Sequence, residues 1–141
     1  MDHVVYLDTQ AGELHNLLAG KKTMLIRGAA GRKLPYGRVQ PGDWLYLLNN
    51  DGQGLVQARA EVSQVLNSER LAPEASLQLI AAHQEALQLT EKQRERWGGK
   101  RYLVLIGVIE VEALPPFHID KSAYGNMDDW LPVGDINSVR V

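Results

Sequence analysis

A β-hairpin pattern in the middle of the chain constrains the fold more strongly than any other feature of the sequence. Residues 44–48 are apolar, Asn50-Asp51-Gly52 is a strong turn signal, and residues 56–65 then alternate between apolar and polar side chains. Such alternation buries one face of a strand and exposes the other. The pattern therefore predicts two antiparallel strands, and other segments must supply the partners that complete their sheet.

Three further segments are typical of strands. Residues 4–7 form a short β-like run, and residues 23–27 are compatible with a strand. Residues 102–109 are almost all apolar, which predicts a central strand buried on both faces. Gly107 within it would permit a bulge or a close backbone approach. Near the C-terminus, Trp130 and residues 138–141 are possible edge pairings.

Helical patterns separate these strands. Residues 11–19 predict a helix that ends at Gly20, and residues 73–87 predict another. Thr90 and Gln93 have the spacing of a capping box, which predicts a short helix that closes at Gly98-Gly99. The residues expected to face the core are Leu14, Leu17 and Leu18 in the first helix, and Leu77, Ile80, Ala81 and Leu87 in the second.

These elements favour an α+β fold in which an antiparallel or mixed sheet curls towards a barrel and helices pack at its side. A doubly wound α/β fold is the weaker alternative, because Gly28 to Gly31 lacks the spacing and the following helix of a phosphate-binding turn. The length of 141 residues suits one domain. We expect residues 1–113 to form it and residues 114–141 to pack on it as an extension.

Composition excludes several kinds of chemistry. The chain has no cysteine, so disulfides, thiolate metal sites and cysteine nucleophiles are absent. We expect neither a metal nor a cofactor, since the four histidines, His3, His15, His83 and His118, are too scattered for a recognisable site. No apolar stretch approaches the roughly 20 residues of a membrane span, and the N-terminus has no signal pattern. A cytoplasmic protein is therefore expected.

Positive charge is concentrated in one part of a chain whose net charge is -2. No acidic residue lies between Glu13 and Asp43. The cations of this stretch, with two nearby aromatic residues, could hold phosphates and stack unpaired bases at one wall of a cleft. The candidate binding residues are Lys21, Lys22, Arg27, Arg32, Lys33, Tyr36, Arg38 and Trp44.

The same stretch carries a family resemblance. The string Leu-Ala-Gly-Lys-Lys-Thr-Met-Leu-Ile-Arg at residues 18–27, followed after a loop by Val-Gln-Pro-Gly-Asp at residues 39–43, resembles the signature of the ASCH domain family, a branch of the PUA-like barrels. The order of strands, turns and helices agrees over residues 3–113. The resemblance implies RNA or nucleotide recognition in a cleft between barrel and helices, and it does not by itself imply catalysis.

One enzymatic branch of that family resembles small amidohydrolases that remove the acetyl group from N4-acetylcytidine with a lysine, a threonine and a glutamate. The resemblance places Lys22 at the lysine position and Glu85 at the glutamate position. Leu25 stands where the branch has its threonine, so the hydroxyl nucleophile is missing. Thr23 would replace it only with a different local backbone, because on a strand its side chain points away from the face of Lys22.

Three functions follow as alternatives. The preferred hypothesis is a non-catalytic module that binds RNA or a nucleotide, and the second is an amidohydrolase acting on acylated nucleosides. In the third, the barrel is only a scaffold and residues 114–141 bind a partner. Simpler interpretations of the individual residues also exist. Lys22 and the basic loop would be solvated, Glu85 would be helix surface, Trp97, Trp130 and Tyr124 would be core or rim packing, and Asp128-Asp129 would be capping or solvated groups.

Overall fold

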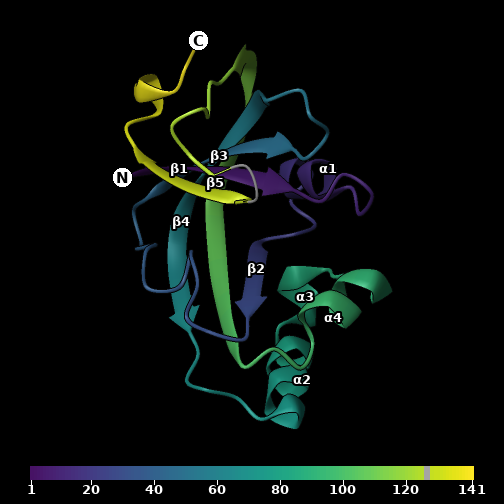
Figure 1. The fold of residues 1–141 in the computed structure, drawn as a ribbon. Helices are drawn as coiled ribbons and strands as arrows, with labels where there is room; N and C mark the ends of the chain where they lie inside the picture. The colour runs from purple at the N-terminus through teal and green to yellow at the C-terminus, as the bar shows by residue number, and fades with distance from the viewer. Residues whose placement is uncertain (126–127) are drawn as a thin grey trace.

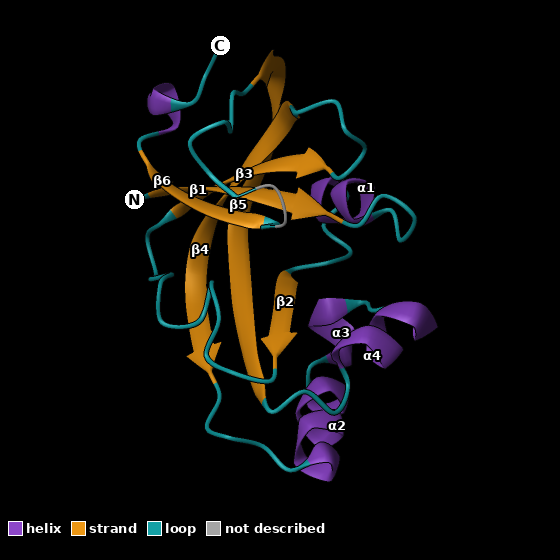
Figure 2. Ribbon diagram, in the orientation of Figure 1, coloured by secondary structure: helices purple, strands orange, loops and turns teal. Residues whose placement is uncertain are grey.

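Six strands form one curled sheet in the computed structural model, which describes residues 1–125 and 128–141 (Figure 1). Their order across the sheet is β2-β5-β4-β3-β1-β6. Figure 2 shows that β1, β3 and β6 run across the upper part of the long strands β4 and β5, which gives the sheet its curl. The strands are β1 (Asp2–Leu7), β2 (Met24–Ala29), β3 (Trp44–Asn49), β4 (Leu55–Asn67), β5 (Tyr102–His118) and β6 (Trp130–Gly134).

The predicted hairpin is confirmed as β3 and β4. These strands are antiparallel, with Leu45 opposite Ala60 and Leu47 opposite Ala58, and all four of these side chains are buried. The alternating polar residues lie on the other face. β4 extends beyond the predicted end at Val65, because its last residues pair with β5.

The sheet is mixed, since β1 is parallel to β3 and antiparallel to β6, while β2–β5, β3–β4 and β4–β5 are antiparallel. The expected α+β class, a curled sheet with helices at its side, is confirmed. The doubly wound alternative is wrong, because within residues 1–125 and 128–141 only one strand pair is parallel. β6 begins at Trp130, so the predicted edge pairing of this residue is also confirmed.

Four α-helices of the described chain lie beside the sheet, and α3 and α4 contact β2. Gly20 follows α1 with φ 75°, a left-handed conformation that suits glycine, as expected for a helix end. The capping box is confirmed, with Thr90 Oγ1 accepting from the Gln93 amide and Gln93 Oε1 accepting from the Thr90 amide. The helices are α1 (Glu13–Leu18), α2 (Pro73–Ala82), α3 (Gln84–Leu87) and α4 (Glu91–Trp97).

The single helix predicted over residues 73–87 is wrong in two respects. His83 leaves the helical conformation and separates α2 from α3, while its imidazole contacts the Leu79 carbonyl at 3.0 Å. Leu77 is 54% exposed and Ala81 is also exposed, so neither belongs to the buried side. The break changes the direction of the chain after residue 82. Of the four residues predicted to face the core, Ile80 and Leu87 alone are buried. In α1, Leu18 is exposed while Leu14 and Leu17 are buried.

β5 contains the close approach predicted at Gly107. A Cβ atom built on Gly107 would lie 2.8 Å from the side chain of Gln64, at a bulge in the β4–β5 pairing. The strand continues through residue 113 to His118, so the regular structure does not end at the boundary expected there. Beyond it, η1 (Ile136–Ser138) is tied to β1 by a 2.8 Å hydrogen bond from the Ile136 amide to Asp2 Oδ2.

The apolar side chains form three clusters. One fills the inside of the curled sheet, a second lies between β2, β5 and helices α2 to α4, and a third lies under the C-terminal segment. Trp130 belongs to the first and Trp97 to the second, as expected for core packing. None of the helices in the described residues is long and apolar enough to span a membrane.

His3 is the one fully buried histidine of the described chain, and its neighbours fix its tautomer. The indole N–H of Trp130 donates to Nδ1 at 3.1 Å, so Nδ1 carries no proton and Nε2 donates to Asp43 Oδ2 at 2.8 Å. Asp43 also accepts from the Gln40 amide and lies 3.5 Å from the amino group of Met1. Burial lowers the pKa of the imidazole below its ordinary value of 6.5, although Asp43 opposes the shift. The folded protein therefore favours neutral His3.

The free energy of unfolding is expected to fall in mild acid because of His3. Below about pH 6.5 the unfolded chain takes up a proton that folded His3 resists, so the free energy of unfolding decreases by up to about 1.4 kcal/mol per pH unit. Urea unfolding between pH 5 and 7 measures the slope. His3→Gln should flatten it, and His15→Gln, at an exposed position on α1, should leave it unchanged. An equal slope in wild type and His3→Gln would contradict the assignment.

Candidate functional site

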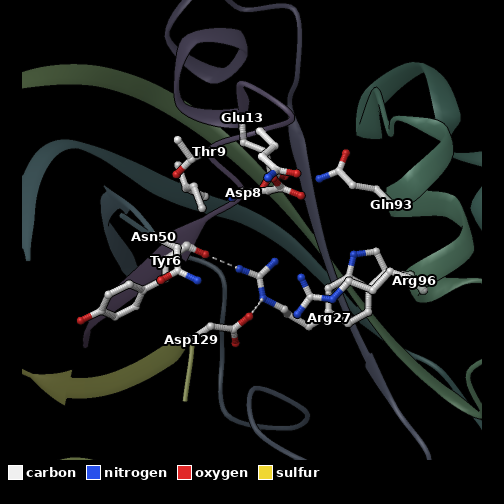
Figure 3. A pocket seen from close by; sticks show the side chains of 12 residues that line it. Tyr6, Asp8, Thr9, Glu13, Arg27, Asn50, Gln93, Arg96 and Asp129 are labelled. Atoms are coloured by element: carbon white, nitrogen blue, oxygen red, sulfur yellow. Dashed lines mark hydrogen bonds and ion pairs between the residues drawn. The ribbon is translucent and has the colours of Figure 1, made fainter. Parts of the chain in front are cut away.

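A polar cavity of about 430 Å³ lies between the end of β1, the strand β2 and helix α4 (Figure 3). Its volume falls within the range of small-molecule sites. The lining combines three carboxylates, two guanidinium groups, three carboxamides, two hydroxyls and two aromatic rings. The residues are Tyr6, Leu7, Asp8, Thr9, Gln10, Glu13, Arg27, Asn50, Gln93, Arg96, Trp97 and Asp129.

The loop between β1 and α1 folds back on itself and forms one wall. Asp8 Oδ1 accepts from the Ala11 amide at 3.0 Å, and Glu13 Oε1 accepts from the Asp8 amide at 2.8 Å. Gly12, with φ 66°, provides the left-handed turn into the helix. Figure 3 shows that this loop presents Asp8, Thr9 and Glu13 to the same space. The wall is therefore set by its own short hydrogen bonds.

Helix α4 forms the opposite wall. The capping box engages Gln93 Oε1, which leaves the Gln93 Nε2 group to face Asp8 and Glu13 across the cavity (Figure 3). One turn further on, the Arg96 guanidinium lies 4.4 Å from the centre of the Trp97 ring. Trp97 is buried and Arg96 is exposed, so the arginine forms a charged rim that covers the Trp97 ring.

Arg27 is the buried cation at the centre of the site. Its Nη1 donates to the Ile26 carbonyl and its Nη2 to the Tyr6 carbonyl, each at 2.8 Å. Nε lies 3.2 Å from Asp129 Oδ2, at an angle outside that of a good hydrogen bond. The guanidinium also lies 5.9 Å from the Trp97 ring centre. These contacts fix its position, and the Asp129 carboxylate balances part of its charge.

A buried ion pair supports the wall behind Glu13. Lys22 is 1% exposed, and its ammonium lies 3.2 Å from Glu13 Oε2 and donates to the Leu87 carbonyl. Burial lowers the pKa of Lys22 below its usual range, and the nearby Arg27 cation adds to this effect, while Glu13 opposes it. Lys22 itself does not line the cavity. It holds Glu13 in place and links α1 to α3.

Solved structures share this arrangement of elements. The crystal structure of ASCH from Zymomonas mobilis matches with a TM-score of 0.67 and 14% identity, over 92% of this chain and 85% of that one. Two variants of that protein, one Tyr-to-Phe and one Ser-to-Ala, match with the same score and identity, and 87% and 85% of those chains are covered. This chain has an ASCH-like fold. No family model and no curated protein matches the sequence.

The ASCH-like fold does not bring together the residues that correspond to the amidohydrolase branch. Lys22 contacts Glu13 and a backbone carbonyl. Thr23 and Glu85 are both exposed, the latter on α3, and neither lines the cavity. Leu25 is fully buried in the core inside the sheet. None of these contacts presents a hydroxyl to Lys22.

The candidate binding residues separate into different places. Of these residues, Arg27 alone lines the cavity of the ASCH-like fold. Lys21 is exposed in the turn before β2, and Trp44 lies on β3 with the Arg59 guanidinium 4.3 Å from its ring centre. Arg32, Lys33, Tyr36 and Arg38 lie in the loop after β2.

Several lining residues were not among the candidates. Asp129 was expected to be solvated or capping, and it instead pairs with Arg27. Gln93, Arg96 and Trp97 have the three- and four-residue spacing of one helical face, which would have indicated a shared surface. Asp8 carries no comparable signal. Within the described chain, no group of three or more His, Asp or Glu side chains is arranged to hold a metal ion.

The Lys22–Glu13 pair should behave as a structural unit. Lys22→Met leaves the buried Glu13 carboxylate without its cation and should cost about 3–5 kcal/mol of unfolding free energy. Adding Glu13→Gln removes the uncompensated charge and should recover most of that loss. Urea denaturation of both variants measures the difference. Lys21→Met, at the exposed neighbouring position, serves as the control and should change stability by less than about 0.5 kcal/mol. Equal losses in the single and double variants would contradict this role.

Proposed function

We propose that the cavity binds one nucleotide, either free or as part of an RNA chain, without catalysis. The observation that carries the proposal is the joint placement of two guanidinium groups, a tryptophan and several hydrogen-bonding side chains around one open space of suitable size. Phosphate, ribose and base each require one of these kinds of group. The ASCH-like fold, which resemblance associates with RNA or nucleotide recognition, supports the same proposal.

The phosphate would lie at the rim beside Arg96. Its guanidinium is exposed and faces no carboxylate within ion-pair distance in the described chain, whereas Arg27 is already paired with Asp129. A planar guanidinium matches phosphate oxygens with two parallel hydrogen bonds. Arg27 fixes the geometry of the site from inside through its contacts with Asp129 and two carbonyls. Arg96 therefore replaces the lysines of the basic stretch as the main phosphate contact.

The base would lie over the Arg96 and Trp97 pair. Bases in single-stranded RNA stack on aromatic rings and on guanidinium planes, and here the two planes are held together at 4.4 Å. Asn50 can donate to and accept from a base edge, and Gln93 can donate through Nε2, because its Oε1 is engaged in the capping box. The carboxylate of Asp8 can accept from an exocyclic amine or a ribose hydroxyl. The three carboxylates of the lining also disfavour a ligand that carries only negative charge.

The described part of the C-terminal segment does not close the site. It contributes β6 and η1, and among residues 114–125 and 128–141 Asp129 is the one member of the cavity lining. Lys22 is buried, but it is covered by Glu13 and α3 rather than by this segment. The scaffold hypothesis would instead require the C-terminal segment to cover Lys22 and fill the cleft. The open cavity thus supports ligand binding over the scaffold hypothesis.

Arg96→Gln should weaken nucleotide binding by about tenfold, because a charge-assisted phosphate contact is lost at the rim. Calorimetric titration with the four ribonucleoside 5′-monophosphates at low salt measures this effect. Arg94→Gln is the matched control on the same helix, where the arginine instead donates to the Leu89 carbonyl at 2.9 Å. It should change the affinity by less than about twofold.

Two results would overturn the proposal. The first is the absence of binding by wild-type protein for all four nucleotides at millimolar concentration. The second is an equal loss of affinity in Arg96→Gln and Arg94→Gln, which would place the phosphate elsewhere or show only a general effect of charge. Raising the salt concentration should weaken binding to wild type, since phosphate contacts release counterions.

A further inference from the structure

Two segments without acidic residues lie side by side at the lower end of the sheet. One is the stretch from residue 14 to residue 42, and the other runs from residue 96 to residue 109 and contains Arg96, Lys100 and Arg101. The β2–β5 pairing joins them, with Arg27 opposite Val104 and Ala29 opposite Tyr102. Figure 1 shows the loop that leaves β2 and the turn that enters β5 at the same end of the molecule. The cations that follow β2 and precede β5 therefore lie near one another, with the Arg32 guanidinium 5.4 Å from the Tyr102 ring centre and Lys100 beside Gly28.

Two tyrosines lie at the centre of this surface. The rings of Tyr36 and Tyr102 meet edge to face at 5.7 Å, and the Arg32 guanidinium lies 5.8 Å and 5.4 Å from their centres. Tyr36 is held by a hydrogen bond from its hydroxyl to the Ser68 carbonyl at 2.5 Å. Both rings are half-buried. The aromatic pair and its cation are thus fixed in place while one side stays accessible.

Lys33 and Lys100 flank the tyrosines. Lys33 lines a shallow hollow with Tyr36, Tyr102 and Arg27. Lys100 crosses Gly28, where a Cβ atom would lie 3.3 Å from the lysine side chain and 2.7 Å from Leu103. Among residues 1–125 and 128–141, no carboxylate lies within 4.0 Å of the charged groups of Arg32, Lys33 or Lys100. Their charges are available to a ligand.

Arg27 connects this surface to the cavity, because it lines both the cavity and the hollow. The hollow measures only about 20 Å³, far below the roughly 300 Å³ at which small-molecule sites begin, so it cannot admit a base. A ligand would instead pass over it with phosphates near the lysines. A strand that begins in the cavity would reach this surface by passing Arg27 and Gly28.

We propose that Arg32, Lys33, Tyr36, Lys100 and Tyr102 form a basic strip that holds the continuation of a single-stranded RNA whose first bound nucleotide occupies the cavity. This inference rests on the proposed function and extends it from one nucleotide to a chain. An acidic polypeptide could also bind a surface of exposed cations. An aromatic pair among those cations, however, is typical of surfaces that bind unpaired nucleic acid. The strip adds affinity through phosphates and carries little base specificity.

The experiment compares a strip variant with a charge-matched control. The strip variant is Lys33→Gln with Lys100→Gln, and both positions are exposed. The control is Lys21→Gln with Arg140→Gln, also exposed and outside both the cavity lining and the strip. Lys21 precedes β2 whereas the strip follows its far end, roughly 20 Å away along the strand. The probes are ribonucleoside 5′-monophosphates, a fluorescent single-stranded RNA of about eight nucleotides, and a poly-glutamate peptide of similar charge.

Wild type should bind the RNA at least about tenfold more tightly than a monophosphate at low salt, and the strip variant should lose most of this gain. The dependence of log K on log salt should become shallower by about 1.4, the value for two phosphate contacts on a single strand. Monophosphate affinity should stay within about twofold, because neither lysine touches a nucleotide in the cavity. The control variant should bind RNA like wild type.

Unchanged RNA affinity in the strip variant would overturn the proposal that the strip binds RNA, and it would leave the cavity proposal standing. Equal losses in the strip and control variants would overturn it as well, and so would poly-glutamate that competes as strongly as RNA. If monophosphates do not bind but the strip variant still loses RNA affinity, the cavity proposal fails and the strip is supported. Wild-type protein that binds neither probe would overturn both.

Discussion

The guanidinium of Arg27 joins parts of the molecule that are distant in sequence. It extends from β2 to the Tyr6 carbonyl at the end of β1 and to Asp129 before β6. Its centre lies 5.9 Å and 5.6 Å from the ring centres of Trp97 and Trp130. A buried cation without partners would be strongly unfavourable, so each contact offsets part of the cost of removing this charge from water. The cavity takes its shape from these requirements, because the end of β1, the segment before β6 and α4 all meet at one side chain.

Lys22 meets a similar requirement five residues earlier in the chain. Its ammonium is enclosed by Glu13 and the Leu87 carbonyl, which brings α1 and α3 to the start of β2. Glu13 then accepts from the Asp8 amide and turns the loop of residues 8–13 towards the cavity. Lys22, which precedes β2, thus positions the loop wall, and Arg27, within β2, lies at the centre of the site.

Local patterns predicted most of the elements. The hairpin of β3 and β4, the capping box at Thr90, the end of α1 at Gly20 and the crowding at Gly107 each depend on residues close together in the chain or on one backbone conformation. The break at His83 was missed because the apolar spacing continues across it. The imidazole contact with the Leu79 carbonyl and the turn between α2 and α3 leave no signal in that spacing.

The site was predicted less well than the fold because its residues are brought together by pairings distant in sequence. Alternation extended from the strand predicted at residues 23–27 places Lys22 and Thr23 on opposite faces, but it does not show which face is buried. The partners of Lys22 are nine and 65 residues away. Arg27, a candidate from the sequence, lies in the lining, whereas the places of Asp129 and Arg96 depend on where β6 and α4 pack.

The cations of residues 14–42 therefore have two physical roles, which their position relative to the sheet decides. Lys22 and Arg27 lie within or beside β2, where neighbouring strands and helices exclude water, and each needs a carboxylate and backbone carbonyls. Arg32 and Lys33 follow the end of β2, where water solvates them and no such partner is required. A buried, compensated cation has little charge left to attract a phosphate but determines the geometry of a site. An exposed cation determines little geometry but keeps its charge for a ligand, so the shape of the cavity and its attraction for nucleic acid come from different residues of one basic segment.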